Sequence, residues 1–162
     1  MKDTAFWVAA RFVLGLVFLW AFLDKLFGWG FATKPAAAWL AGGSPTSGFL
    51  TNAVHGPFKE LFNNLSGSAV VDWLFMLALL CLGLALILGV GLKIAGWGGA
   101  LLMFLMWLAL LPPANHPFID EHIVYGILLI GLATSASEAG RSWGLGKWWA
   151  STRLVQKYSF LE

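Results

Sequence analysis

The stretch RFVLGLVFLWAFLDK, residues 11–25, is an apolar run with charged residues at both ends. Extended to residues 5–27, it is long enough, at about 1.5 Å per residue, to cross a hydrocarbon layer of about 30 Å as a helix. Spacings of three and four residues place five side chains on one stripe of this helix: Arg11, Gly15, Phe18, Phe22 and Lys25. Because a charge facing lipid costs about 2.5 to 3.5 kcal/mol at mid-depth, we expect the stripe to face protein.

The charges on this stripe have two interpretations. Arg11 and Lys25 can snorkel toward opposite membrane surfaces and orient the helix around a packing seam. Alternatively, they belong to a polar site that faces the neighbouring helices. The stripe alone leaves both interpretations open.

The composition predicts an integral membrane protein. The 162 residues are 59% hydrophobic and 11% charged, with a mean hydropathy of +0.78, whereas soluble domains carry about 25% charged residues. The net charge of +2 is too small to indicate a nucleic-acid partner. Cys81 is the single cysteine, so no intrachain disulfide can form, and we expect a buried packing thiol.

Four apolar runs are long enough to span a bilayer, at about residues 5–27, 70–90, 95–112 and 120–138. They predict an all-α fold, an integral membrane four-helix bundle that forms a single domain over residues 1–160. Residues 161–162 are expected to be vector residues. Small residues at four-residue spacing are expected to let the helix backbones approach closely, namely Ala85, Gly89, Gly91, Ala95 and Gly99.

The distribution of basic residues predicts that both termini are cytoplasmic. Basic residues on the side of the termini are Lys2, Lys93, Arg141, Lys147, Arg153 and Lys157, against Lys34 and Lys59 on the other side. The tail, residues 139–160, also contains Trp143, Trp148 and Trp149. Aromatic residues among basic ones are typical of an interfacial anchor on anionic lipid.

The segment 28–69 is predicted to form an outside cap made of short interfacial helices. Pro35 is expected to begin the first short helix, and Thr46 to cap a second one over residues 47–54. Pro57 precedes a third short helical stretch with apolar residues at helical spacing. Both a lid over a cavity and a skirt lying on the membrane surface fit this pattern.

Polar residues from several predicted spans are expected to gather near the outer membrane surface. They are Asp24, Lys25, Asp72, His116, Asp120, Glu121, His122 and Tyr125. If some face the bundle axis, they form a pocket in which Lys25, His122 or Tyr125 stabilises the head group of a quinone. A carboxylate such as Asp24 or Asp120 can then orient these groups or relay protons.

Three more side chains are assigned to this expected pocket, and one charged side chain is assigned a role elsewhere. Phe18 and Phe22 flank the quinone ring or tail, although packing in the core explains them as well. Asp72 is assigned to the same pocket. Arg11 is assigned a structural role at the inner end, bonded to Thr134, Ser135 or Glu138. The sequence contains no metal, haem or nucleotide motif, because His55, His116 and His122 lack paired spacing and there is no CxxCH.

Several motifs together resemble the DoxX/DoxD family of bacterial membrane proteins. They are Asp24-Lys25, residues 42–46 (GGSPT), residues 72–76 (DWLFM), residues 120–125 (DEHIVY) and residues 143–147 (WGLGK). The resemblance covers nearly the whole chain. It implies a four-helix bundle in the inner membrane and, for DoxD members, the membrane subunit of a thiosulfate:quinone oxidoreductase with a DoxA partner. Because only a short basic tail follows the fourth predicted span in this sequence, we do not expect a fused DoxA-like domain.

Three functions follow as hypotheses. The first is a quinone-interacting redox subunit that takes electrons from thiosulfate or a related sulfur donor. The second is a non-enzymatic scaffold or assembly subunit for a DoxA-like or other redox partner, with homo-oligomerisation also possible. A transporter is the weakest, because the spans show no pair of broken helices.

Overall fold

The computed structural model describes residues 2–135 and 142–161, and every regular element within them is a helix. The long helices are α1 (Lys2–Phe27), α4 (Ala69–Leu88), α5 (Leu92–Ala109) and α6 (Glu121–Thr134). Between α1 and α4 lie η1 (Pro35–Ala37), η2 (Trp39–Ala41), α2 (Ser47–Asn52) and α3 (Lys59–Asn63). The tail contains α8 (Gly146–Ala150), α9 (Arg153–Lys157) and η3 (Ser159–Leu161). The predicted all-α class is confirmed.

Three helices are long and apolar enough to cross a membrane: α1 over Thr4–Phe27, α4 and α5. As described, α6 has 14 residues, which at about 1.5 Å per residue gives about 21 Å, less than a hydrocarbon layer of about 30 Å. The predicted fourth span, 120–138, ends outside the described residues. The fold is therefore that of a helical protein with three helices suited to a bilayer.

At the turn between α4 and α5, two helix boundaries differ from the predicted ones. Gly89 and Gly91 have φ angles of 75° and 65°, a left-handed conformation that residues with a Cβ rarely adopt. Consequently α4 ends at Leu88, and α5 begins at Leu92, three residues earlier than the predicted residue 95. Gly89, predicted to lie at the end of the second span, instead caps the C-terminal end of α4, and Gly91 lies in the connection between the two spans.

The closest approaches between helix backbones occur at two other glycines. A Cβ added at Gly83 of α4 would lie 2.9 Å from the backbone nitrogen of Leu19 in α1. A Cβ added at Gly96 of α5 would lie 2.5 Å from the carbonyl oxygen of Leu129 in α6. The long helices therefore pack closely as two pairs, α1 with α4 and α5 with α6, through small residues.

The charged stripe of α1 faces the protein, as predicted. Arg11 is fully buried, Phe18 is buried in the main hydrophobic core, and Phe22 packs against that core. Lys25 is half-buried. Cys81 does not follow its prediction: its side chain is exposed on the surface of α4. Because α4 is suited to a bilayer, this exposed surface is one that lipid can cover.

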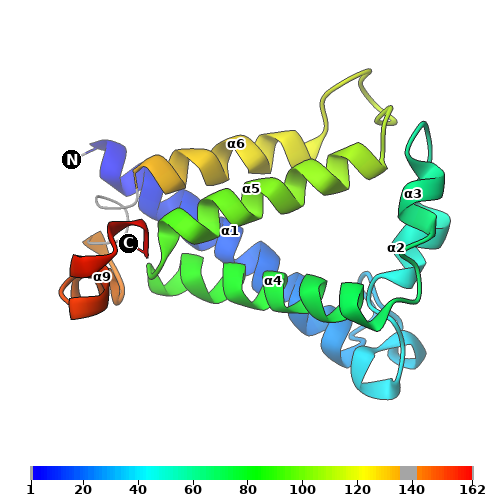
Figure 1. Ribbon diagram of the computed structural model, residues 1–162, viewed down its shortest axis with the longest axis horizontal. Helices are drawn as coiled ribbons and strands as arrows, with labels where there is room; N and C mark the ends of the chain where they lie inside the picture. The colour runs from blue at the N-terminus through cyan, green and yellow to red at the C-terminus, as the bar shows by residue number, and fades with distance from the viewer. Residues whose placement is uncertain (1, 136–141, 162) are drawn as a thin grey trace.

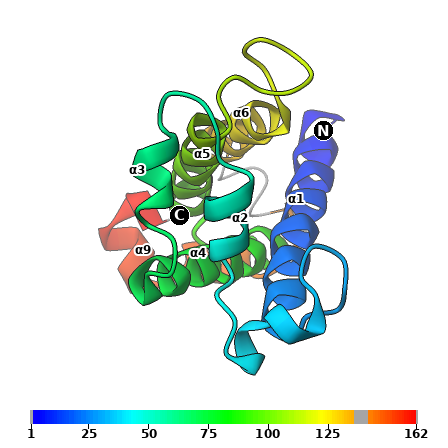
Figure 2. The same cartoon turned by 90° about the vertical axis from the view of Figure 1, so that its right-hand side faces the viewer.

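The two ends of the bundle differ in what covers them (Figure 1). Both termini lie at one end, together with the turn between α4 and α5 and the short helix α9; we call this the inner end. The opposite end, which we call the outer end, holds α2, α3 and the loop between α5 and α6. Figure 2 views the outer end and shows α2 and α3 in front of α4 and α5.

Short helices occupy the cap much as predicted, with two differences at α2. This residue precedes α2, but its side chain makes no capping hydrogen bond to that helix. Its hydroxyl instead donates to the Asp72 carboxylate of α4 at 2.5 Å. Helix α2 also ends at Asn52 rather than at residue 54. The Thr46 hydroxyl therefore ties the cap to the bundle.

Candidate functional site

An apolar cavity of about 200 Å³ lies at the outer end. Helices α4 and α5 supply walls through residues such as Phe75 and Met106. Helices α2 and α3 contribute Phe49, Leu50 and Phe62, consistent with their place in front of α4 and α5 (Figure 2). This arrangement favours the interpretation of segment 28–69 as a lid.

The mouth of this cavity faces a surface that lipid can cover. Leu65 and Leu105 line the cavity and remain 39% and 41% exposed. Leu105 belongs to α5, one of the helices suited to a bilayer. An apolar molecule dissolved in the membrane could therefore enter from the side, without first passing through water.

Lys25 is the one charged residue among those that line the cavity. Its Nζ lies 5.8 Å from the centre of the Phe75 ring, a weak cation–π contact. Among the residues that the structure describes, no carboxylate forms an ion pair with Lys25. A cation against an apolar wall is an attractive partner for an anionic or carbonyl oxygen.

Asp24, the neighbour of Lys25 on α1, has a different environment. Its carboxylate is 1% exposed and accepts hydrogen bonds from the backbone N–H groups of Phe31, Ala32 and Thr33, at 3.2, 3.0 and 2.8 Å. Three backbone donors stabilise the charged carboxylate and fix the loop that follows α1. This arrangement suits an orienting carboxylate.

Asp72 holds the other part of the cap. It is 7% exposed, and its Oδ1 accepts from the hydroxyls of Ser44 and Thr46 and from the Thr46 backbone N–H. Ser44 in turn accepts from the Ser47 backbone N–H at 3.1 Å. Asp72 does not line the Lys25 cavity, and instead positions the Ser44–Thr46 turn whose residue Thr46 does.

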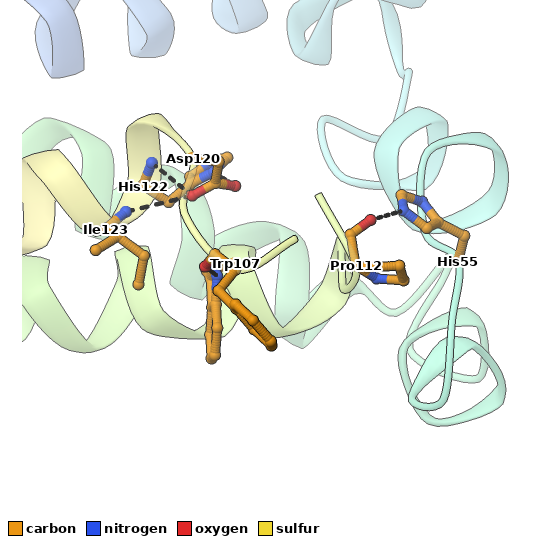
Figure 3. A network of polar contacts seen from close by, with 7 residues as sticks. His55, Trp107, Pro112, Asp120, His122 and Ile123 are labelled. Carbon is orange, nitrogen blue, oxygen red and sulfur yellow. Dashed lines mark hydrogen bonds and ion pairs between the residues drawn. The ribbon is translucent and has the colours of Figure 1, made fainter. Parts of the chain in front are cut away.

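Asp120 and His122 form a pair at the start of α6 (Figure 3). Asp120 Oδ1 accepts from the backbone N–H groups of His122 and Ile123, as an N-cap does. Asp120 Oδ2 lies 2.9 Å from His122 Nδ1. The His122 ring is largely buried, and this contact fixes its orientation, which suits a proton-transfer group whose Nε2 is the reactive atom.

Tyr125 lies one turn after His122, half-buried against the main core. Leu129, one turn further along α6, is fully buried in the same core. Phe18 also lies in this core, which supports its packing interpretation.

A second, more polar cavity of about 260 Å³ adjoins the start of α6. Asp120 and Glu121 line it together with Asn115 and His55, and Lys25 does not. The expected single pocket is therefore not formed: Lys25 lines the apolar cavity, and Asp120 and Glu121 line the polar one. The other polar residues expected there line neither of these two cavities, namely Asp24, Asp72, His116, His122 and Tyr125. The His116 ring accepts the backbone N–H groups of Phe118 and Ile119 within its own loop.

His55 joins the cap to the end of α5, a role that the sequence did not indicate. Its Nδ1 lies 2.9 Å from the Ala53 carbonyl oxygen and its Nε2 3.0 Å from that of Pro112 (Figure 3). Only the doubly protonated ring can donate to both oxygens. The hydrogen bond to Ala53, followed by that to Pro112, raises the pKa of His55 above its usual value. Trp107 Nε1 donates to the Phe118 carbonyl of the neighbouring loop.

Asp120, Glu121 and His122 each place one possible metal ligand within 4.8 Å of the others. Among the residues that the structure describes, this is the group whose side chains could together hold a metal ion. Two of the three, Asp120 and His122, already bond to each other. The grouping is also explained by first-turn acids at a helix N-terminus.

Arg11 is fully buried near the inner end, as expected for a structural residue. Its Nη2 donates to the Trp143 carbonyl at 2.9 Å, joining α1 to the tail. The expected partner Thr134 instead donates to carbonyl oxygens of its own helix, Ile130 and Gly131. Glu138 lies outside the described residues.

Fold and cavity together define a class: an all-α protein with three helices suited to a bilayer and a lidded apolar cavity with a cation at its edge. No family model, curated protein or solved structure matches this chain.

Proposed function

We propose that the chain is a quinone-interacting redox subunit of the bacterial inner membrane, similar to DoxX/DoxD proteins. One observation carries the proposal: Lys25 is the one charged lining residue of an apolar cavity that is also lined by exposed Leu105 of α5, a helix suited to a bilayer. A quinone combines an apolar ring and tail with polar carbonyl oxygens. Its body fits the apolar walls, and one oxygen fits the ammonium group.

The membrane arrangement in this proposal is a four-helix bundle with α6 as the fourth span. The start of α5, with Lys93, and helix α9, with Arg153 and Lys157, lie at the inner end, whereas α3, with Lys59, lies at the outer end (Figure 1). This bias supports cytoplasmic termini and an outer end on the opposite side of the membrane.

Each site residue has a role in the proposed reaction. Lys25 stabilises the oxyanion that develops as the quinone is reduced. His122 transfers protons, with Asp120 fixing its orientation. Tyr125, which packs against the core one turn after His122, is a second candidate for a head-group or proton-transfer residue. Asp24 holds the loop after α1 in place.

The electrons in this proposal come from thiosulfate or a related sulfur anion. Two thiosulfate ions that join through a new S–S bond release two electrons, and the quinone takes these electrons with two protons to become a quinol. The donor reaches the outer end directly or through a DoxA-like partner.

The proposal is tested by measuring thiosulfate-dependent quinone reduction in membranes. Lys25→Ala and His122→Ala should lose this activity while their abundance stays normal. Lys34→Ala, an exposed lysine at the same end, is the matched control and should keep it. Equal activity in all variants would remove Lys25 and His122 from the mechanism.

A scaffold without redox chemistry is the second candidate. Trp20, Phe27, Trp29 and Phe31 form an exposed aromatic cluster with ring centres 5.1 to 5.6 Å apart. Such a cluster is suited to a protein contact or to the membrane interface. Against a purely structural outer end, Lys25 forms no ion pair with Asp120. Co-purification of a redox partner, lost in Trp29→Ala and unaffected by Lys25→Ala, would favour the scaffold.

A further inference from the structure

A groove of about 320 Å³ follows the surface between α4 and α5 toward the inner end. Small and apolar residues line it, including Ala78, Cys81, Ala85, Gly91 and Gly98. The lining residue Cys81 is exposed. A groove along two helices suited to a bilayer has the shape and polarity to receive an acyl chain.

The basic tail lies at the inner end of this groove. A Cβ at Gly91, a groove residue, would lie 3.9 Å from the Leu161 carbonyl oxygen of η3. Lys93, in the first turn of α5, donates to the Ser159 carbonyl of η3 at 3.0 Å. The tail therefore packs on the bundle where the groove ends, in a defined position.

The charge of the tail has one sign over the residues that the structure describes. Residues 142–161 contain Lys147, Arg153 and Lys157 and no aspartate or glutamate. Large apolar side chains beside these cations remain exposed, with Trp148 at 61% and Phe160 at 60%. Basic residues next to exposed aromatic ones match the head-group layer of an anionic membrane surface.

We propose that an anionic phospholipid binds at this place, with one acyl chain in the groove between α4 and α5 and its phosphate beside the basic tail. The groove supplies affinity for any phospholipid chain, and the tail supplies selectivity for negative charge. The site is separate from the Lys25 cavity and does not depend on the proposed redox function.

Native mass spectrometry of the detergent-purified full chain, titrated with phosphatidylglycerol or phosphatidylcholine, tests the proposal. Wild type should bind phosphatidylglycerol more tightly. Lys147→Gln/Lys157→Gln should lose about 25-fold of this preference, because each basic residue near an anionic surface contributes about fivefold. Lys34→Gln/Lys59→Gln removes the same charge at the outer end and should keep the preference.

A substitution at Gly98 tests the groove separately from the basic tail. A Cβ at Gly98 would meet no atom within 4 Å, so the side chain of Gly98→Leu begins in open space and adds bulk to the groove. It should weaken binding of both lipids and leave their ratio unchanged. In wild type, phosphatidylglycerol should also slow the alkylation of Cys81 by N-ethylmaleimide.

The salt dependence of lipid binding by wild type tests the proposal without any variant. The preference for phosphatidylglycerol should fall as ionic strength rises from about 0.05 M to about 0.5 M, because salt screens exposed charges. Equal binding of the two lipids by wild type, or an unchanged preference in Lys147→Gln/Lys157→Gln, would overturn the proposal. So would unchanged binding in Gly98→Leu, or a groove filled by a second copy of the chain.

Discussion

Asp24 and Lys25 are neighbours on α1, yet their charged groups meet opposite surroundings. The Asp24 carboxylate is buried and accepts three backbone hydrogen bonds from the loop that follows. The Lys25 ammonium group lines an apolar cavity and forms no ion pair with any described residue. Adjacent helix positions differ by about 100° in direction, so one residue points to the loop and the other to the cavity.

This difference separates a structural charge from a candidate binding charge. A buried carboxylate whose oxygens already accept several hydrogen bonds stabilises the fold and has little capacity left for a ligand. Asp72 follows the same pattern as Asp24. A cation against an apolar wall costs stability unless something else compensates it, which is a common condition of functional sites.

Removing the Asp24 carboxylate is expected to have the largest effect. Asp24→Ala leaves three backbone N–H groups without their acceptor and should lower the free energy of unfolding by about 3 to 5 kcal/mol. Thermal unfolding in detergent measures this loss. Glu60→Ala, which removes an exposed acid from α3, is the control and should change stability little. Similar midpoints for Asp24→Ala and wild type would refute the structural role of Asp24.

Replacing Lys25 should have the opposite effect on stability. Lys25→Met keeps the length of the side chain and removes a charge from an apolar wall, so the free energy of unfolding should stay unchanged or rise by about 1 kcal/mol. Thermal unfolding again provides the measurement. A loss as large as that of Asp24→Ala would mean that Lys25 is structural, and the contrast between the two residues would collapse.

The smallest expected effect concerns the lid. Because hydrogen bonds to carbonyl oxygens raise the pKa of His55, its protonated form stabilises the folded state. This contribution is fully present below the unfolded pKa of about 6.5 and is lost as pH rises through the higher folded value. The positive charge of Lys59 in α3 disfavours the protonated form of His55. The side chains of Asp120 and Glu121 line the same polar cavity as His55.

The difference between wild type and His55→Gln isolates this contribution. Thermal midpoints measured from about pH 6 to about pH 9 should show wild type losing stability relative to His55→Gln as pH rises. Parallel curves would show that the His55 contacts do not depend on its protonation.

The sequence predicted the helices well because apolar runs of twenty residues leave few alternatives in a bilayer. It also predicted that the stripe from Arg11 to Lys25 faces protein. It placed four polar residues near one end of the bundle. Of these, Lys25 and Asp120 line cavities there, and Asp72 holds the lining residue Thr46. Asp24 instead holds the loop after α1.

What the sequence could not give is the direction in which each charge points. Whether Asp72 faces a ligand or the Ser44–Thr46 turn depends on how the cap folds, and the cap has no strong periodicity. Cys81 shows the same limit, because a thiol within an apolar run can face the core or the lipid. His55 was missed because its two acceptors are backbone carbonyls, which no sequence motif records.

The most direct test of the Lys25 cavity is the quinone content of the purified protein, measured by solvent extraction and absorbance. Wild type should retain about one quinone per chain. Lys25→Met, and Val71→Phe, which adds bulk at a lining residue of the cavity, should both lose it while staying folded. Quinone that is absent from wild type, or equally retained by both folded variants, would contradict the account.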